Sequence, residues 1–569
     1  MARTLFDNTP TIYMSRRPFD FSHKVTTSLS VGSLTPIDIK ETLPGDTWKC
    51  KCTFQARLST AFLRPVMDSF FMRLFHFHVP LRLLYTDIES VFGSTSPNAY
   101  TQPLFKDFPY IDNKSVDGLM ISSRSVGDYL GLAVGNVPNK ISVLPFRAFA
   151  LIYDQWFRNQ NTISPMLIQK GEASNSELPN GYAWSPNNYT GMLPKINKFN
   201  DYFTSALPAP QKGPPVTFSF TGDAPLKGIG YVDNETTNPA ARFSPFWYVT
   251  GSNTPATGLL EASNGYTTHD SSVPEQINNV SLGLSVNASN PDSTLAVDLS
   301  SVSLFNVNDF RFAVQLQKML EKDARSGGRY VEYLQAHYGV RVPDGLMQRA
   351  ELLGGTTTPL SVQQVAQTSQ SETNNPLGSL GAYSRSIGYS RFSKGIVEHG
   401  YLITVAAIQY KHSYQQGISK LWTRRSRDDF YDPLFANLGE QPVLKSQLYG
   451  IVKDGGAIPG DDIMKSPIFG YQEYGAEYRF CPDSITGQMR SGTPDLPFSF
   501  DVYHFGDNYS NVPSLTSSFT NETPAYFRRA TALEGDNNDV DDFLCEFYFN
   551  ETVYRTMPLR SIPGLVDHH

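Results

Sequence analysis

The sequence is poor in cysteine, in charged residues and in long hydrophobic runs, and each shortage excludes a class of protein. Four cysteines in 569 residues are too few for a disulfide framework, which fits a protein made in a reducing cytoplasm. The longest apolar run, around Leu402–Ile408, is too short to span a bilayer, and the N-terminus lacks the apolar core of a signal peptide. The sequence therefore predicts neither secretion nor membrane insertion.

Catalytic motifs are missing as well. There is no phosphate-binding glycine loop, no GxSxG elbow and no HExxH helix. His76 and His78 share one face of a predicted strand without a third ligand nearby, so histidines of a core or an interface are favoured over a metal site, and Cys50 and Cys52 are interpreted as structural. An acidic run lacks the glycine and closing glutamate of a calcium loop, although isolated cation capture stays open there (Asp536, Asp539, Asp541 and Asp542). We predict no enzyme, no cofactor and no metal site.

The balance of charge is mildly acidic. Lysine and arginine number 47 against 54 aspartates and glutamates, which gives a net charge of −7. A chain that coated nucleic acid through its overall charge would be basic. Contact with DNA is therefore expected to be local, weak for the isolated chain, and supplemented by a separate basic partner.

The residues that are abundant favour many short strands. Aromatic residues make up 13% of the chain, and 42 glycines and 39 prolines punctuate it. In Ser69–Val79, apolar residues occupy both alternating faces, as expected for a strand buried between two layers. The other predicted strands are Trp48–Leu58, Ile396–Gln409, Glu473–Phe480, Phe498–His504, Asp542–Tyr548 and the region of Tyr202 and Phe203.

Three segments have helical periodicity. Leu144–Asn161 begins with Pro145 and carries an aromatic stripe. A second pattern starts near Asn308 and stops at Gly327 and Gly328. A short third helix is predicted over Tyr330–His337, with Gly339 as its C-terminal stop.

Several long sequence words occur in an order that resembles one family, the major capsid proteins of the Microviridae, the small icosahedral single-stranded-DNA bacteriophages, and in particular the gokushovirus branch. They are LPFRAFALIYDQWFRNQN (Leu144–Asn161), KFNDYFTSALPAPQKGP (Lys198–Pro214), QLQKMLEKDARSGGRYVEYLQAHYGV (ending at Val340), SYQQGISKLWTRRSRDDFYDPLFANLGEQPVL (Ser413–Leu444), FGYQEYGAEYRF (Phe469–Phe480) and PGLVDHH (Pro563–His569). The resemblance runs from about residue 40 to the end and omits Gly222–Ser301.

This resemblance implies a fold, a function and partners. The fold is all-β with helical insertions, a single eight-stranded jelly-roll, which the many strands with long connections also suggest. The function is that of a virion protein that assembles in the bacterial cytoplasm into a T=1 icosahedral capsid around single-stranded DNA. The implied partners are further copies of the chain, the packaged DNA, a small basic DNA-binding protein, an internal scaffolding protein, a pilot protein and a host surface receptor.

The predicted domain organisation has three parts. Residues 1–40 are expected to form an N-terminal arm, and residues 41–221 with 302–569 the jelly-roll domain. Residues 222–301 have two basic against eight acidic residues and are expected to form an inserted protrusion, placed at the threefold axis by the resemblance and used for host attachment. A small aromatic core is expected inside it (Phe243, Phe246, Trp247 and Tyr248). The polar stretch Thr356–Ser386 is interpreted as an extended loop.

Two basic clusters are candidate DNA contacts. The first lies in the predicted arm, at Arg16, Arg17 and Lys24. The second follows Trp422, whose ring could stack on an unpaired base, and comprises Lys420, Arg424, Arg425 and Arg427. Because Asp428 and Asp429 follow at once, local or intersubunit ion pairs are the favoured interpretation of the second cluster.

Two other functions remain as alternatives. A jelly-roll carbohydrate-binding module would explain the polar insertion with its aromatic residues, but it predicts a secreted and much smaller protein. A β-sandwich glycosidase needs two carboxylates that face one cleft, and no such pair is evident in the sequence.

Overall fold

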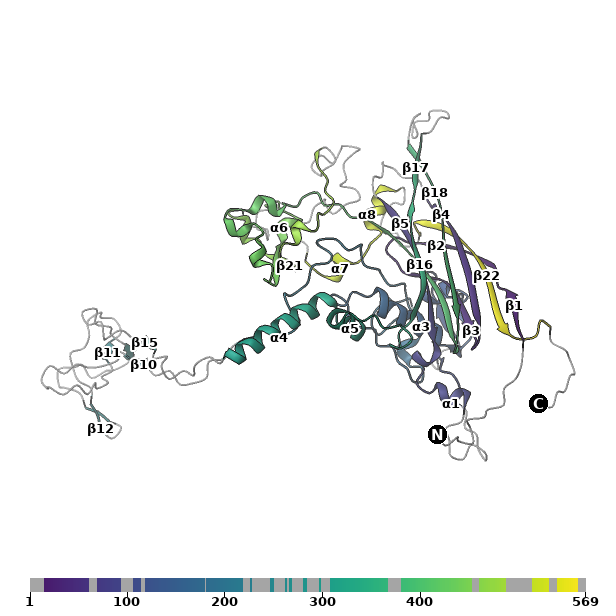
Figure 1. Ribbon diagram of the computed structural model, residues 1–569, viewed down its shortest axis with the longest axis horizontal. Coiled ribbons are helices and arrows are strands. Elements are labelled where there is room, and N and C mark those ends of the chain that lie inside the picture. The colour runs from purple at the N-terminus through teal and green to yellow at the C-terminus, as the bar shows by residue number, and fades with distance from the viewer. Residues whose placement is uncertain are drawn as a thin grey trace. The chain divides into compact units, whose positions relative to one another are not determined.

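Ten strands of the computed structural model form two antiparallel sheets (Figure 1). The structure describes residues 15–60, 69–93, 106–113, 118–179, 181–217, 226–227, 246–249, 261–263, 266–268, 280–283, 296–297, 307–366, 380–452, 460–487, 514–531 and 540–560. The chain divides into two units, one made of Met1–Gly213 with Leu320–His569 and the other of Pro214–Met319. Both sheets belong to the first unit.

The six-stranded sheet has the order β1-β22-β4-β18-β17, with β2 also paired to β22. Along β4 and β22, buried and exposed residues alternate strictly, so one face is apolar and the other faces solvent. Its strands are β1 (Arg16–Asp20), β2 (His23–Leu29), β4 (Thr47–Leu58), β17 (Val362–Ala366), β18 (Leu380–Gly395) and β22 (Phe543–Thr556).

The four-stranded sheet has the order β16-β5-β19-β3 and is covered on both faces. All eleven residues of β19 are buried, which explains its continuous apolar sequence. The strands are β3 (Thr35–Thr42), β5 (Phe70–Pro80), β16 (Glu351–Leu360) and β19 (Gly400–Tyr410). The prediction that β5 is apolar on both faces is confirmed, because Phe70 and Met72 pack in one core and Phe77 and Val79 in another.

The first core lies between the two sheets. Trp48 and Phe54 of β4 and Phe547 of β22 meet Met72 of β5 and Ile408 of β19, and each is fully buried. Burying a large apolar side chain contributes about 1.5–3 kcal/mol. This core therefore holds together strands that are hundreds of residues apart in the sequence.

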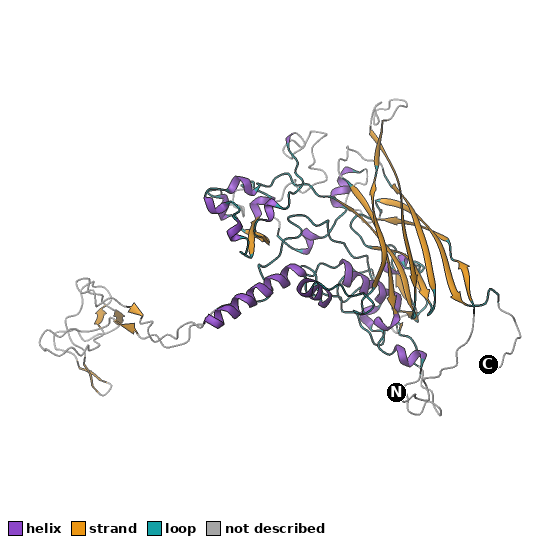
Figure 2. Cartoon of the chain, viewed as in Figure 1, coloured by secondary structure: helices purple, strands orange, loops and turns teal. Residues whose placement is uncertain are grey.

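The second core covers the other face of the four-stranded sheet with helix α3 (Leu144–Ile152), as Figure 2 shows. The predicted helix there is confirmed, with Pro145 in its first turn and a π-helical turn, Tyr153–Phe157, at its end. Short elements complete this layer: α1 (Ile88–Phe92), α2 (Val126–Tyr129), and two small antiparallel pairs of strands, β6 (Tyr110–Ile111) with β9 (Ile141–Ser142), and β7 (Leu119–Ile121) with β8 (Gly135–Val137).

A third, smaller core gathers Tyr202, Phe203, Val443 and Phe469. The elements around it are β20 (Glu440–Leu444), α6 (Lys445–Leu448), β21 (Ile468–Glu473), α7 (Ser517–Thr520) and α8 (Ala525–Ala530). Single 3₁₀ turns occur at Leu81–Leu83, Asn175–Glu177, Lys420–Thr423, Arg427–Asp429, Pro433–Phe435, Ile463–Lys465 and Ala476–Tyr478.

The two later helices also match their predictions. Helix α4 spans Val307–Ser326 and ends before Gly327, and α5 spans Tyr330–Tyr338. Gly339 ends α5 with a φ of 70°, a left-handed conformation that glycine adopts without steric cost. No helix in the described ranges is both long and apolar enough to cross a membrane.

The described residues of the second unit form three nested antiparallel pairs of strands. β10 (Leu226–Lys227) pairs with β15 (Ala296–Val297), β11 (Phe246–Val249) with β14 (Val280–Gly283), and β12 (Glu261–Ser263) with β13 (Tyr266–Thr268). Of the four residues expected to form its aromatic core, Phe246, Trp247 and Tyr248 lie on β11, and Phe243 lies outside the described residues.

The predicted arm needs correction from Arg16 onward. Residues 16–42 contribute β1, β2 and β3 to the two sheets, and residues 1–14 lie outside the described ranges. The residues of β1 and β2 are mostly exposed or half-buried, so these two strands carry little of the apolar alternation that reveals a strand in a sequence.

The prediction of a loop over Thr356–Ser386 is also wrong at both ends. Thr356, Thr357 and Thr358 pair with β5, and Val362–Ala366 pairs with the start of β18. Threonine is β-branched and favours strands, and the backbone bonds here are satisfied by neighbouring strands without an apolar pattern. Residues 367–379 lie outside the described ranges.

Two predicted strands are turns. The carboxylate of Asp201 accepts hydrogen bonds from the backbone N–H groups of Phe203 (2.9 Å) and Thr204 (2.7 Å), which folds the chain into a tight turn. At Glu473–Phe480, β21 ends at Glu473 and Gly475, with a φ of 74°, redirects the chain into a 3₁₀ turn. The predicted strand Phe498–His504 lies outside the described residues.

Candidate functional site

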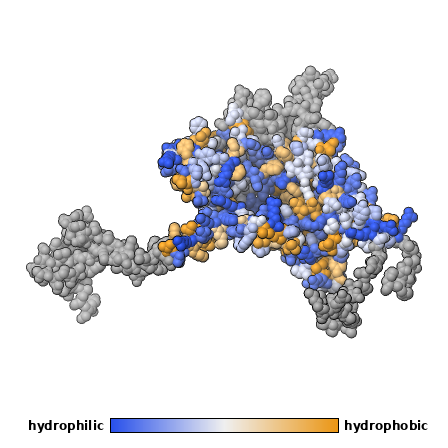
Figure 3. Space-filling view, in the orientation of Figure 1, coloured by the Kyte–Doolittle hydropathy of each residue, from blue (hydrophilic) through white to orange (hydrophobic). Residues whose placement is uncertain are grey.

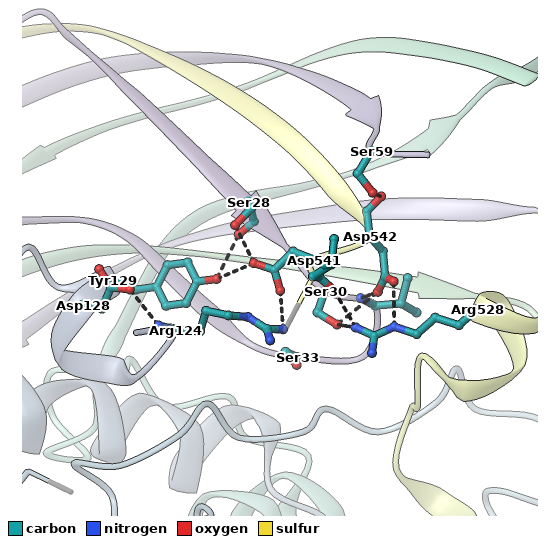
Figure 4. A network of polar contacts seen from close by, with 12 residues as sticks. Ser28, Ser30, Ser33, Ser59, Arg124, Asp128, Tyr129, Arg528, Asp541 and Asp542 are labelled. Carbon is teal, nitrogen blue, oxygen red and sulfur yellow. Dashed lines mark hydrogen bonds and ion pairs between the residues drawn. The ribbon is translucent and has the colours of Figure 1, made fainter. Parts of the chain in front are cut away.

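A network of polar contacts in the first unit lies at the start of β22, where two neighbouring aspartates point to different arginines (Figure 4). Asp542 is fully buried and accepts hydrogen bonds from Ser30 Oγ (3.0 Å), Val31 N (2.9 Å) and Arg528 Nε (3.0 Å). Arg528, on α8, also donates to the carbonyl oxygen of Val540 (2.9 Å). Asp542 therefore joins β22, the segment after β2 and α8 at one point.

Asp541 makes the second half of the network. Its carboxylate accepts hydrogen bonds from Ser28 Oγ (2.5 Å) and Arg124 Nη2 (2.5 Å), and the Tyr129 hydroxyl lies 3.1 Å away. Arg124 has a φ of 62°, an uncommon conformation for a residue with a side chain, and its N–H donates to Asp128 (2.7 Å). Burial and the Asp541 charge raise the pKa of Tyr129.

A cleft of about 890 Å³ opens beside this network. Asp541, Arg124, Arg528 and Lys195 line it, and Lys195 Nζ donates to Ser33 Oγ at 3.0 Å. Burial lowers the pKa of Lys195. Because arginines neutralise both aspartates, the cleft does not offer the pair of free carboxylates that glycoside hydrolysis requires. The arrangement is suited to fastening strands and helices together.

Of the four aspartates in the acidic run (Asp536, Asp539, Asp541 and Asp542), the structure describes two. Asp541 and Asp542 are committed to arginines, whereas Asp536 and Asp539 lie outside the described residues. Across the ranges that the structure describes, no group of three or more histidine, cysteine, aspartate or glutamate side chains could hold a metal ion.

His76 and His78 are buried in the four-stranded sheet. The ring of His76 lies 2.9 Å from Thr404 Oγ1, and that of His78 lies 3.2 Å from Thr42 Oγ1. Burial lowers the pKa of each histidine to about 4. Cys50 and Cys52 are buried on β4 as free thiols, and burial raises the pKa of both, so neither is activated as a nucleophile.

The buried histidines predict a loss of stability in acid. Their folded-state pKa near 4 lies below the unfolded value near 6.5, so the unfolded chain binds more protons between these pH values. Stability should be complete above pH 6.5 and decline toward pH 4, by roughly 3 kcal/mol for each histidine.

The measurement is urea unfolding of the purified chain at pH 7.0 and pH 4.5, compared with a His76→Gln variant. The variant should lose part of this pH dependence, because its side chain does not titrate. An identical pH dependence in both proteins would contradict the assignment of a proton-free buried histidine.

The arginine cluster near Trp422 is largely paired with carboxylates. Lys420 Nζ lies 3.0 Å and Arg424 Nη2 3.5 Å from Glu477 Oε1, and Arg425 forms two bonds to Asp462, at 2.9 and 2.6 Å. The hydrogen bonds from the Arg425 guanidinium, with a further one from Met464 N, lower the pKa of Asp462 to about 2. Arg427 is exposed in a 3₁₀ turn. The favoured interpretation as local ion pairs thus matches the geometry for three of the four residues.

The other candidate DNA contacts lie at the edge of the six-stranded sheet. Arg16 and Arg17 are exposed on β1, and Arg16 Nη2 donates to Thr47 Oγ1 at 3.1 Å. Lys24, on β2, lies 3.5 Å from Glu546. Contact of these residues with DNA stays a prediction.

An exposed apolar segment between residues 421 and 438 has no periodic pattern in the sequence that predicts it. Leu421, Trp422 and Leu434 are 67%, 78% and 84% exposed. Phe430 and Leu438 are also more than half exposed. We call these five residues the apolar segment. Figure 3 shows further hydrophobic surface along α4. A patch of this kind marks a site of protein contact.

Comparison with known proteins gives a consistent result. Residues 7–565 match the family model described as "Capsid protein (F protein)". The chain is 34% identical to the capsid protein VP1 of Chlamydia phage 1, over 98% of this chain and 97% of that protein. It is also 34% identical to the capsid proteins VP1 of Bdellovibrio phage phiMH2K, over 98% and 97%, and of Spiroplasma virus 4, over 97% and 96%.

Proposed function

We propose, from the premise that this chain belongs to the capsid protein (F protein) family, that its copies assemble into a closed T=1 icosahedral shell around a single-stranded DNA genome. The chain is a structural protein of the phage virion, and its family is not one of enzymes. The match over nearly the whole chain is the observation that carries this proposal.

We infer further that eight of the ten strands are those of a jelly-roll. In that fold a long antiparallel hairpin is wrapped so that its four strand pairs alternate between two sheets. The four pairs here would be β2 with β22, β3 with β19, β4 with β18, and β5 with β16. Pairing of β22 with β4 and of β19 with β5 supports this order, and β1 and β17 would be additions to it.

The apolar segment supports extensive contact between copies. Large exposed apolar side chains are costly in water, and obligate interfaces bury such residues over wide areas. Sedimentation of the chain co-expressed with its phage partners tests assembly. Particles should dominate, with free monomer as a minor species.

Other partners are proposed on charge and family grounds. With a net charge of −7, the chain is expected to rely on a small basic DNA-binding protein to condense the genome. An internal scaffolding protein and a pilot protein are proposed for assembly and DNA delivery. A host surface receptor is the proposed partner of residues 222–301.

Replacing residues 222–301 with a short Gly-Ser linker should leave particles that form and hold DNA but adsorb poorly to host cells. The antiparallel pair of Leu226 with Val297 supports this, because it brings the two ends of the segment close together and a short linker can close the gap. Few basic residues and many polar ones also suit an exposed segment.

Adsorption is measured with labelled particles, after imaging and nuclease-protected DNA have confirmed that the shells are intact. Normal adsorption by intact shells would contradict the attachment role. Failure to form shells would assign the segment to particle stability instead.

A further inference from the structure

The solvent-facing side of the six-stranded sheet is strongly basic. Exposed residues alternate with buried ones along β4 and β18, and the exposed positions include Lys49, Lys51, Arg57, Arg385 and Arg391. We call these five residues the basic face. Within the described part of the chain, none of them forms an ion pair with a carboxylate. The basic face therefore concentrates positive charge on one side of an acidic protein.

The strand register sets like charges directly opposite each other. Lys51 is opposite Arg391, and Arg57 is opposite Arg385. Like charges at directly opposed positions destabilise a sheet. The exposed carboxylate of the neighbouring β22, Glu546, is opposite Gln55, in the row next to Arg57, and lies 3.5 Å from Lys24 Nζ. An anion bound over the sheet would remove this repulsion.

Exposed tyrosines lie between the two like-charge pairs. Tyr548 and Tyr389 flank Thr53 on opposite sides in one cross-strand row, and they are 49% and 63% exposed. Lys51 Nζ is 5.9 Å from the centre of the Tyr389 ring. From Lys49 to Arg57 the strand extends about 27 Å, which is long enough for several nucleotides.

We propose that the basic face binds single-stranded nucleic acid, with phosphates at the two like-charge pairs and bases stacked on Tyr389 and Tyr548. This rests on the proposed function and assigns its genome contact to a defined surface. Single strands suit the surface because unpaired bases can stack on exposed rings, whereas paired bases are closed to them. An acidic protein segment would satisfy the charges but would not require the tyrosines.

The test is fluorescence anisotropy of a labelled 20-nucleotide oligo-dT with the purified full-length chain, as a function of salt. A variant with Lys51, Arg57, Arg385 and Arg391 all changed to glutamine should bind roughly tenfold more weakly or worse at low salt. Its slope of log affinity against log salt should fall by about 3, since each phosphate contact on a single strand contributes about 0.7. The double variant Lys170→Gln/Arg341→Gln removes exposed charges elsewhere and should bind as the wild type does.

Two further measurements separate binding from structure. The quadruple variant should unfold at an equal or higher temperature than the wild type, because it loses repulsion and no ion pair. Tyr389→Ala/Tyr548→Ala should weaken binding about tenfold while leaving the salt slope unchanged. A lower unfolding temperature together with unchanged DNA affinity would overturn the proposal.

Other outcomes are equally decisive. Binding of a poly-glutamate peptide in preference to oligo-dT, with no effect of the tyrosine changes, would assign the face to an acidic protein and overturn the nucleic-acid site.

Particle formation by the quadruple variant is scored separately by electron microscopy. Intact shells with a normal DNA content would refute this site alone, whereas a wild-type chain that forms no shell would refute the proposed function.

Discussion

Changing Trp422 and Leu434 to aspartate should abolish particle formation while leaving the chain folded. Both side chains are more than three-quarters exposed in the isolated chain, so their replacement removes no core packing. In an assembled shell they are expected to lie in a contact between copies, where a buried unpaired carboxylate costs several kcal/mol at every repeated interface. Because a closed shell repeats each contact, such a penalty is multiplied over the particle.

Sucrose-gradient sedimentation and electron microscopy of co-expressed material measure this effect. The matched control, Trp422→Phe/Leu434→Met, keeps the apolar character and should still assemble. Unfolding of the soluble aspartate variant should occur at the wild-type temperature. Normal particles from the aspartate variant would remove the apolar segment from the assembly contacts.

Changing Asp542 to alanine should destabilise the first unit by about 3–5 kcal/mol. The substitution leaves the buried guanidinium of Arg528 without its carboxylate and leaves Val31 N and Ser30 Oγ without their acceptor. Since β22 pairs with β1, β2 and β4, its start is a point on which much of the six-stranded sheet depends. Urea unfolding followed by tryptophan fluorescence gives the change.

Two controls identify the cause. Asp461→Ala removes an exposed aspartate paired with Lys465, and should change stability by less than about 1 kcal/mol. Asp542→Ala/Arg528→Leu removes both buried charges and should recover part of the loss. Equal effects of Asp542→Ala and Asp461→Ala would show that the network in Figure 4 does not fasten the sheet.

Elements with a strong apolar period were predictable from the sequence. Helix α3 and strand β5 were predictable because their buried positions recur at the helical or strand spacing. Helix α4 was predictable from the helical spacing of its apolar residues, although Ala313 is the only one of them that is buried. The end of α5 was predictable for a different local reason, because few residues other than glycine end a helix in the left-handed conformation of Gly339. For α3 and β5 the local pattern and the tertiary packing agree.

The missed elements depend on partners that are distant in the sequence. The threonines of β16 pair with β5, more than 270 positions earlier in the chain, and no local pattern announces that pairing. Interpreting Thr356–Ser386 as a loop also hid the position of Arg385 opposite Arg57. Lys49 and Lys51 alternate with buried cysteines on β4, which puts both lysines on the exposed face of that strand. They form a charged surface only after β18 pairs with β4 in the folded sheet.

The sequence predicted the pairing of the basic cluster near Trp422 only in part, and it did not predict the basic face. Asp428 and Asp429 correctly suggested that the cluster near Trp422 is neutralised locally, yet the main partners are Glu477 and Asp462, which only the fold brings near. The arginines of the basic face are separated from other basic residues in the sequence, so no charge cluster predicts them. The density of charge on a sheet surface depends on which residues of neighbouring strands lie opposite each other. This register cannot be determined from the sequence of one strand alone.

An icosahedral reconstruction from electron microscopy of particles made by the wild-type chain with its phage partners tests the central claim most directly. A closed shell with one copy of the chain per asymmetric unit is expected, with the two sheets of the first unit recognisable in each copy. A chain that stays monomeric and monodisperse when all its partners are present would contradict its assignment as the shell-forming subunit.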